Sequence, residues 1–140
     1  MKKIIILLFL ILFNLQGCKK SNDSQTNDLK EETFNEFIKK FKSDSEFRLN
    51  RIKFPLNGFN SDENIDNNDV YFWEKENWLF YSSDDFKDSD NMDFKEKVIL
   101  MTDTSMIYRI YKPQSGYEIK YHFKKESKKY YLNFYSYKNI

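Results

Sequence analysis

The chain has 140 residues, of which 19% are aromatic and 32% are charged, and its formal net charge is +1. This length accommodates one ordinary domain, the aromatic content is too high for an intrinsically disordered chain, and the near-neutral charge excludes a general nucleic-acid binder. The single Cys excludes a disulfide framework and a Cys-based zinc site.

The N-terminus has the parts of a secretory signal. Two lysines precede an apolar run over residues 4–13, and this run is shorter than the ~20 residues that span a bilayer. The next residues, Leu15-Gln16-Gly17-Cys18, resemble the end of a bacterial lipoprotein signal, in which a peptidase cuts before the Cys and its sulfur carries a diacylglycerol. We therefore expect residues 1–17 to be a signal peptide and Cys18 to carry acyl chains such as palmitate. An ordinary signal with a stray Cys is the alternative.

Residues 18–28 have the composition of a flexible tether. Lys19 to Asp28 contains no apolar residue, and ten residues reach at most ~35 Å when extended. In lipoproteins of enteric bacteria, an Asp after the Cys retains the protein in the inner membrane, whereas this chain has Lys19. We expect a domain that is held to the membrane by its lipid anchor, most simply at the periplasmic face of the outer membrane.

A single domain is expected over residues 29–140, and it begins with a helix. Its apolar positions are spaced three and four residues apart, as on one face of a helix: Phe34, Phe37, Ile38 and Phe41. Asp28 with Glu31 predicts an N-terminal capping box. A second short helix is expected to restart at Ser43-Asp44, and Pro55 favours an extended chain over residues 52–56.

This opening is similar to that of a known family. The pattern is Phe34-x-x-Phe37-x-x-x-Phe41-x-x-Asp44-x-x-Phe47-x-x-x-Arg51-Ile52-x-Phe54-Pro55-Leu56. It resembles a bacterial lipoprotein family catalogued as domain of unknown function 4348. The resemblance implies an α+β fold similar to nuclear transport factor 2, in which N-terminal helices pack on a curved antiparallel sheet that forms a cone. The family has no assigned activity, so the resemblance implies no catalytic residues.

The C-terminal half independently predicts such a sheet. Segments 97–102, 106–111, 117–124 and 129–137 are rich in β-formers and alternate in polarity. Alternation sets the expected register, because a slip of one residue exposes the buried face. The expected pairs are Ile119 with Phe134, Tyr121 with Leu132, Phe123 with Tyr130, Ile110 with Ile119, Tyr108 with Tyr121, Met101 with Met106, and Ile99 with Tyr108. Together they form an apolar wall for the helix stripe.

The segment between Asn57 and Asn91 is harder to interpret. Residues 70–81 contain Trp73 and Trp78 and are compatible with a hairpin or a short helix. We favour a strand or turn that leads into a short helix at residues 74–80. Each Trp is either core or part of a ligand pocket, since pockets are commonly lined by aromatic side chains.

No metal or cofactor is expected. Residues 62–66 match the start of a calcium loop. Asn67 replaces the turn Gly, however, and the twelfth position is Trp73 rather than Glu. The aspartates between Asp84 and Asp93 are expected to form a charged loop.

The predicted outer face of the sheet carries the remaining candidate contacts. They are Arg109, Lys120, His122, Lys124, Lys129, Tyr131 and Tyr135. Arg109 is expected opposite Lys120, and His122 opposite Tyr131, with no acid across the sheet to orient His122 as a catalytic base. The chain also contains no Gly-flanked nucleophile elbow, so no catalytic residue is predicted.

These patterns favour a non-enzymatic binding or protein-interaction domain of the cell envelope. The alternatives are a small-ligand binder with an aromatic-lined cone pocket and, less expected, an enzyme. Residues 61–96 include twelve acidic and three basic residues, whereas residues 107–140 include two acidic and eight basic residues. This asymmetry fits either a solvated or internally paired surface or an acidic partner for the outer face, such as segment 84–93 of another copy or a separate envelope protein.

Overall fold

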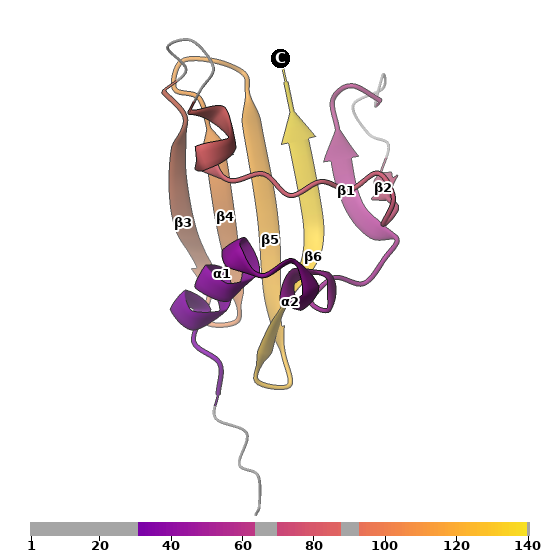
Figure 1. Cartoon of the computed structure of the whole chain (residues 1–140), viewed down its shortest axis with the longest axis vertical. Helices are drawn as coiled ribbons and strands as arrows, with labels where there is room; N and C mark the ends of the chain where they lie inside the picture. The colour runs from indigo at the N-terminus through magenta and orange to yellow at the C-terminus, as the bar shows by residue number, and fades with distance from the viewer. Residues whose placement is uncertain (1–30, 64–69, 88–92, 140) are drawn as a thin grey trace, which may run out of the picture.

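The computed structural model describes residues 31–63, 70–87 and 93–139. In chain order, its elements are α1 (Phe34–Ser43), α2 (Ser45–Leu49), β1 (Leu56–Asn60), β2 (Tyr71–Trp73), the 3-10 helix η1 (Ser83–Phe86), β3 (Lys95–Thr102), β4 (Ser105–Tyr111), β5 (Glu118–Glu126) and β6 (Lys129–Lys138) (Figure 1). This is an α+β arrangement of six strands and two short α-helices. Among the described residues, no helix is long and apolar enough to cross a membrane.

The two helices begin at side-chain caps. Thr33 caps α1 by accepting a hydrogen bond from the backbone N–H of Glu36, whose carboxylate accepts one from the Thr33 hydroxyl in return. The prediction of an Asp28 cap was wrong by more than a turn, because Thr33-x-x-Glu36 offers the same capping box next to the first buried Phe. The predicted restart is confirmed, since Asp44 caps α2 by accepting from Phe47 N–H at 2.9 Å.

The six strands form one sheet in the order β2-β1-β6-β5-β4-β3. The predicted sheet was entirely antiparallel, but the observed sheet is mixed because β1 runs parallel to β6. After α1 and α2 have crossed the face of the sheet, the chain enters β1 in the same direction as β6 (Figure 1). The four C-terminal strands lie where alternation predicted them and form an antiparallel meander.

Two of the three predicted hairpin registers differ from the structure. Between β4 and β5 the prediction is confirmed, with Ile110 opposite Ile119 and Tyr108 opposite Tyr121. Between β3 and β4 the turn at residues 103–104 is as expected, but a bulge shifts the register by one residue. The observed pairs are Leu100 with Met106, Ile99 with Ile107 and Val98 with Tyr108.

The larger difference lies between β5 and β6. The turn contains only Ser127 and Lys128, both with positive φ, which is the geometry of a two-residue hairpin loop. A bulge then leaves Asn133 without an opposite residue, so the observed pairs are Phe123 with Leu132, Tyr121 with Tyr135 and Ile119 with Tyr137. A bulge reverses the alternation beyond it, which is why Tyr135 rather than Phe134 faces the core.

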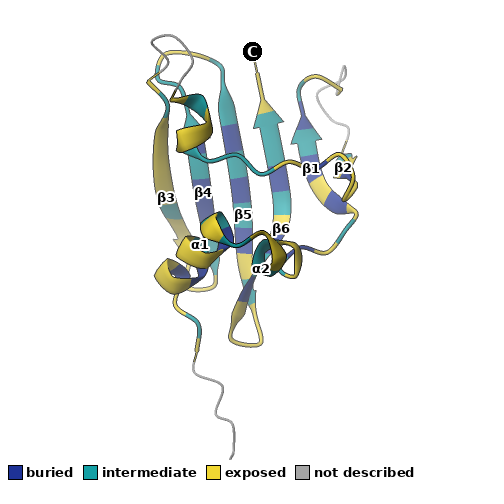
Figure 2. Ribbon diagram, in the orientation of Figure 1, coloured by how far each residue is buried: buried dark blue, intermediate teal, exposed yellow. Residues whose placement is uncertain are grey.

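The core lies between the sheet and a layer made of α1, α2 and the segment 74–87, which crosses the same face of the sheet (Figures 1 and 2). The predicted stripe is confirmed, because Phe34, Phe37 and Phe41 are buried and Ile38 packs against the core. The Phe41 and Phe123 rings meet edge to face, with 5.0 Å between centroids, a favoured aromatic geometry.

The crossing segment contains no α-helix at residues 74–80, contrary to our expectation. After β2 the backbone makes a single turn, in which Asn77 and Trp78 N–H both bond to the Glu74 carbonyl. The chain then runs extended to η1. Trp78 and Phe80 point into the protein there, at a spacing of two rather than three or four, so the extended backbone buries them better than a helix would.

Candidate functional site

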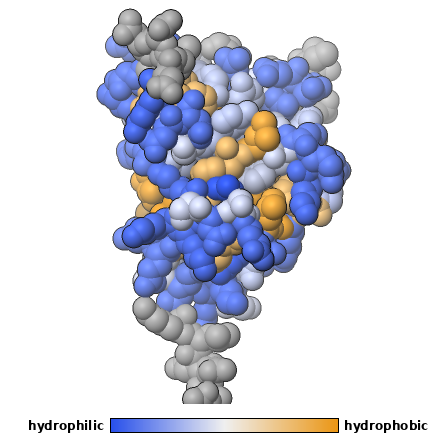
Figure 3. Space-filling view, viewed as in Figure 1, coloured by the Kyte–Doolittle hydropathy of each residue, from blue (hydrophilic) through white to orange (hydrophobic). Residues whose placement is uncertain are grey.

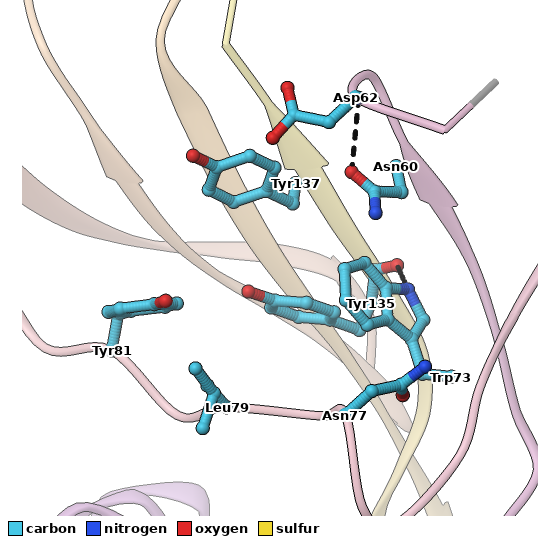
Figure 4. Close-up of a pocket in the computed structure, with 8 residues that line it drawn as sticks. All are labelled: Asn60, Asp62, Trp73, Asn77, Leu79, Tyr81, Tyr135 and Tyr137. Carbon is cyan, nitrogen blue, oxygen red and sulfur yellow. Dashed lines mark hydrogen bonds between the residues drawn. The ribbon is translucent and has the colours of Figure 1, made fainter.

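A pocket of about 190 Å³ opens between the ends of β1 and β6 and the crossing segment (Figure 4). Its lining comes from β1 and the turn that follows, from β2, from the crossing segment and from β6. The lining residues are Asn60, Asp62, Trp73, Asn77, Leu79, Tyr81, Tyr135 and Tyr137. Four are aromatic, and among the described residues none of the lining side chains is basic.

Gly58 fixes the position of Trp73 at the base of this pocket. The Trp73 indole donates its N–H to the Tyr135 carbonyl at 3.2 Å and meets the Tyr135 ring edge to face, with 4.8 Å between centroids. A Cβ at Gly58 would lie 2.4 Å from the indole nitrogen and 2.1 Å from that carbonyl oxygen. Any side chain at position 58 would therefore displace Trp73 or the β1–β6 pairing.

Tyr121 holds the opposite wall. Its buried hydroxyl accepts a hydrogen bond from the Tyr81 backbone N–H at 2.8 Å and donates one to the Tyr81 carbonyl at 3.0 Å. These two bonds fasten the crossing segment to β5, 40 residues away in sequence. The Tyr81 and Leu79 side chains consequently face Tyr135 across the pocket (Figure 4).

The third wall is the turn after β1. Ser61 N–H donates to the Tyr137 carbonyl at 3.0 Å, which ties the turn to β6. The Asn60 side chain is buried and accepts a hydrogen bond from Asp62 N–H at 3.1 Å. This bond orients Asp62, whose carboxylate is directed toward Tyr137 (Figure 4).

Two tyrosines of the pocket, Tyr81 and Tyr135, have pKa values above the ordinary value and are neutral at physiological pH. Burial, together with neighbouring phenols, raises the pKa of Tyr135 well above its ordinary value. Burial also raises the pKa of Tyr81, with smaller contributions from Tyr137 and Asp85. Asp62 contributes to raising the pKa of Tyr117, after burial and the effects of Tyr137 and Tyr81. These rings therefore offer faces and neutral hydroxyls, and the charges that act on them are acidic.

Trp78, the other predicted pocket residue, lies outside this site. Its indole is buried against Phe54 and Tyr135 and also borders a shallower hollow beside α2. Among the described residues, its indole nitrogen has no hydrogen-bond partner. The hollow is lined by Ser45, Arg48, Leu49, Lys75, Trp78, Leu79 and Phe80. Apolar surface gathers in the middle of the face that carries the helices (Figure 3).

The predicted outer face is correct for most of its residues. Arg109 lies opposite Lys120 as expected. The structure also explains how this like-charged pair is tolerated, because Glu118 forms ion pairs with both. Burial alone would raise the pKa of Glu118, but Lys120 and Arg109 outweigh it and lower the pKa below its ordinary value. Arg109 also lies over the Tyr111 ring, 4.3 Å from its centroid.

His122 is on the outer face, opposite Phe134 rather than Tyr131. Burial and the neighbouring Lys120 lower its pKa, against a smaller opposing effect of Glu118. Tyr131 lies opposite Lys124 and receives the cations of Arg51 and Lys53 over its ring.

The remaining residues predicted on the outer face differ in their burial. Lys124 and Lys129 are exposed. Tyr135 was wrongly assigned to this face: the bulge at Asn133 turns it into the core, where it is 1% exposed.

Sequence reasoning missed most of the pocket. Asn60, Asn77, Leu79, Tyr81 and Tyr137 were not singled out, and Asp62 was considered only as a calcium ligand. The available signal was the spacing of Tyr135 and Tyr137, which places both on one strand face. The segment that matches the start of a calcium loop, residues 62–66, was predicted not to bind metal. Residues 64–67 and the lipidation residue Cys18 lie outside the described residues, and within the described ranges no group of three potential metal ligands occurs.

A model of a bacterial protein family matches residues 32–139, which is most of the chain. The chain therefore belongs to this family. No curated protein and no solved structure shows a significant match to the chain.

Proposed function

We propose that this family member is a lipid-anchored envelope protein whose folded domain binds a small ligand in the pocket between β1, β6 and the crossing segment. The observation that carries this proposal is the convergence of four aromatic side chains and a carboxylate on one opening at the edge of the core. Small-ligand sites are typically concave, largely aromatic or apolar, and equipped with a few oriented polar groups.

We also propose the finer family assignment, which fits the same pocket function. The pattern from Phe34 to Leu56 that resembles domain of unknown function 4348 lies within the matched residues 32–139. A fold similar to nuclear transport factor 2 would place a pocket at the open end of a cone. The layer of helices and crossing segment on one sheet face is consistent with that arrangement.

A binding role fits the chemistry of the site better than catalysis. The lining offers one carboxylate, two amides and phenols, of which Tyr81 and Tyr135 have raised pKa values. A general acid or base functions best with a pKa near the working pH. His122, the only histidine of the sequence, lies on the opposite face of the sheet from Tyr121 and the pocket.

Ligand capture tests the proposal. The full chain, purified in non-ionic detergent, is incubated with a small-molecule extract of bacterial envelopes, and retained compounds are identified by mass spectrometry. Leu79→Arg places a long charged side chain at the pocket from a residue that is 58% exposed, so the fold should tolerate it. Leu49→Arg makes the same change at the hollow beside α2 and serves as the control.

We expect at least one retained compound that Leu79→Arg loses and Leu49→Arg keeps. Equal retention by all three proteins, or no retained compound at all, would contradict the proposed pocket function.

The anchor is a separate part of the proposal. The basic start, the apolar run and Gly17-Cys18 support lipidation at Cys18 and attachment at the periplasmic face of the outer membrane. Cells are labelled with a fatty-acid analogue, and the parent chain is compared with Cys18→Ser. We expect the label only in the parent; equal labelling would reject the anchor.

A protein-interaction role is the second candidate, and the outer sheet face favours it. No helix of the described residues covers this face, and Lys97, Arg109 and Lys120 lie in register across three strands. An acidic partner surface, on an envelope protein or a second copy, would fit these cations. Such binding should weaken with salt. Crosslinking at low and high salt, with Lys120→Glu/Tyr131→Ala alongside the parent, tests it; identical crosslinking throughout would leave only a solvated surface.

A further inference from the structure

The pocket contains an acidic group that has no basic partner among the described residues. In the residues that the structure describes, the Asp62 carboxylate forms neither an ion pair nor a hydrogen bond, whereas Glu96 and Glu118 each pair with lysine. Asp62 is held toward the pocket by the bond from its own N–H to Asn60. A carboxylate oriented in this way is available to a ligand.

Aromatic rings surround the same space. Tyr135 and Tyr137 from β6 lie one beyond the other, with Tyr81 across the opening and Trp73 at the base (Figure 4). The face of an aromatic ring carries negative electrostatic potential and attracts cations. The pocket thus combines negative ring faces with a negative charge.

The polar groups of the lining argue against two other ligand classes. An anion would meet Asp62 and no compensating cation among the described lining residues. A sugar is bound through several hydrogen bonds, and part of the amide capacity is already used, because Asn60 accepts from Asp62 N–H and Asn77 donates to the Tyr71 hydroxyl at 3.3 Å. The opening of about 190 Å³ also restricts the ligand to a small molecule.

We propose that the pocket is a site for a small organic ammonium ion, held between the faces of Tyr81, Tyr137 and Trp73 and paired with Asp62. This inference rests on the proposed function and specifies its ligand class. The same chemistry would accept a quaternary ammonium or a protonated alkylamine. Burial among rings increases the attraction, since cation–π contacts strengthen when the cation loses water.

The test compares choline with 3,3-dimethyl-1-butanol, a neutral molecule of the same shape, and with glucose. The full chain in non-ionic detergent is titrated with each and followed by two-dimensional NMR, with the Asp62 and Tyr81 amides as reporters. Asp62→Asn removes the charge at nearly constant shape. Asp103→Asn, in the exposed β3–β4 turn, is the matched control.

We expect choline to bind with a Kd of about 1 mM or tighter and the neutral analogue to bind at least about tenfold more weakly. Asp62→Asn should weaken choline about tenfold without changing the analogue, and Asp103→Asn should change neither. Equal binding of choline and the analogue, or preference for glucose, would overturn the ammonium assignment and leave the pocket function standing. Absence of binding by choline would also overturn it, while the capture experiment with Leu79→Arg decides the pocket function independently.

Discussion

Gly58→Ala should be among the most damaging single-methyl additions to this fold. The new Cβ would lie 2.1 Å from the Tyr135 carbonyl oxygen and 2.4 Å from the Trp73 indole nitrogen. The first contact is to backbone and cannot be relieved by a side-chain rotation. Either β1 moves away from β6, or Trp73 leaves the base of the pocket and its 3.2 Å hydrogen bond to Tyr135 is lost.

The expected loss of unfolding free energy is about 3 kcal/mol. Overpacking of a well-packed core costs typically about 1–3 kcal/mol, and loss of a buried hydrogen bond adds about 1 kcal/mol. Replacing Gly by Ala also lowers the conformational entropy of the unfolded chain, which stabilises the folded state by roughly 0.4–1 kcal/mol and offsets part of this loss. For a domain of this size, 1 kcal/mol shifts the midpoint by roughly 4 °C, so we expect a shift of about 12 °C.

Thermal unfolding of the full chain, followed by circular dichroism, measures this shift. Gly116→Ala is the control, because Gly116 has a negative φ in the turn before β5 and surface substitutions usually stay within about ±0.5 kcal/mol. Equal midpoints for the two variants would refute the close packing of Trp73 over Gly58.

Three further predictions address the register, the wall of the pocket and the acid response. Tyr135→Ala should cost about 3–5 kcal/mol, as for other buried aromatics, and Phe134→Ala much less; the reverse order in chemical denaturation would place the bulge elsewhere than at Asn133. Tyr121→Phe should cost about 1–3 kcal/mol by leaving the Tyr81 N–H and carbonyl unpaired, and hydrogen exchange of the Tyr81 amide should rise; unchanged exchange would show that Tyr121 does not hold the crossing segment. Burial alone would raise the pKa of Glu96, but Tyr108, Lys42 and Ser83 lower it, so its stabilising contribution is present above its unfolded pKa and is lost as pH falls through the lower folded value. In Glu96→Gln, the free energy of unfolding should therefore decrease less between about pH 5 and pH 3 than it does in the parent. The same decrease in both proteins would contradict this.

The sequence was most informative where apolar spacing alone decides the structure. The stripe from Phe34 to Phe41 and the alternation of β4 and β5 each have one arrangement that buries their rings, and both predictions are confirmed. Thr33 was overlooked as the cap because Asp28-x-x-Glu31 has the same pattern as Thr33-x-x-Glu36. The capping-box pattern alone does not show which of the two sites begins the helix. The burial of Phe34, directly after Thr33, does.

Bulges were the main reason that the predicted register was wrong. Asn133 and Met101 each interrupt a strand whose composition gives no sign of an interruption, and Ser127-Lys128 is not a residue pair typical of a tight hairpin loop. Because the bulge at Asn133 was not predicted, Tyr135 was expected on the outer face. Tyr137, which lies on the same face as Tyr135, was therefore not recognised as a pocket residue. The pocket could therefore not be predicted from β6. It also depends on Tyr81 and Asp62, which come from two other parts of the chain.

The irregular features that the sequence did not predict are the ones that form the pocket. A regular β6 would direct Phe134 into the core, whereas the bulge at Asn133 directs Tyr135 and Tyr137 to that face, and their phenol rings carry the hydroxyl that Phe134 lacks. Gly58 lets Trp73 close over the β1–β6 pair, and the extended path after Trp78 brings Tyr81 within reach of Tyr121. Each departure from regular structure therefore brings an aromatic or polar side chain to one opening. If the pocket were only a packing defect, Leu79→Arg would leave ligand capture unchanged, whereas a binding site should lose affinity.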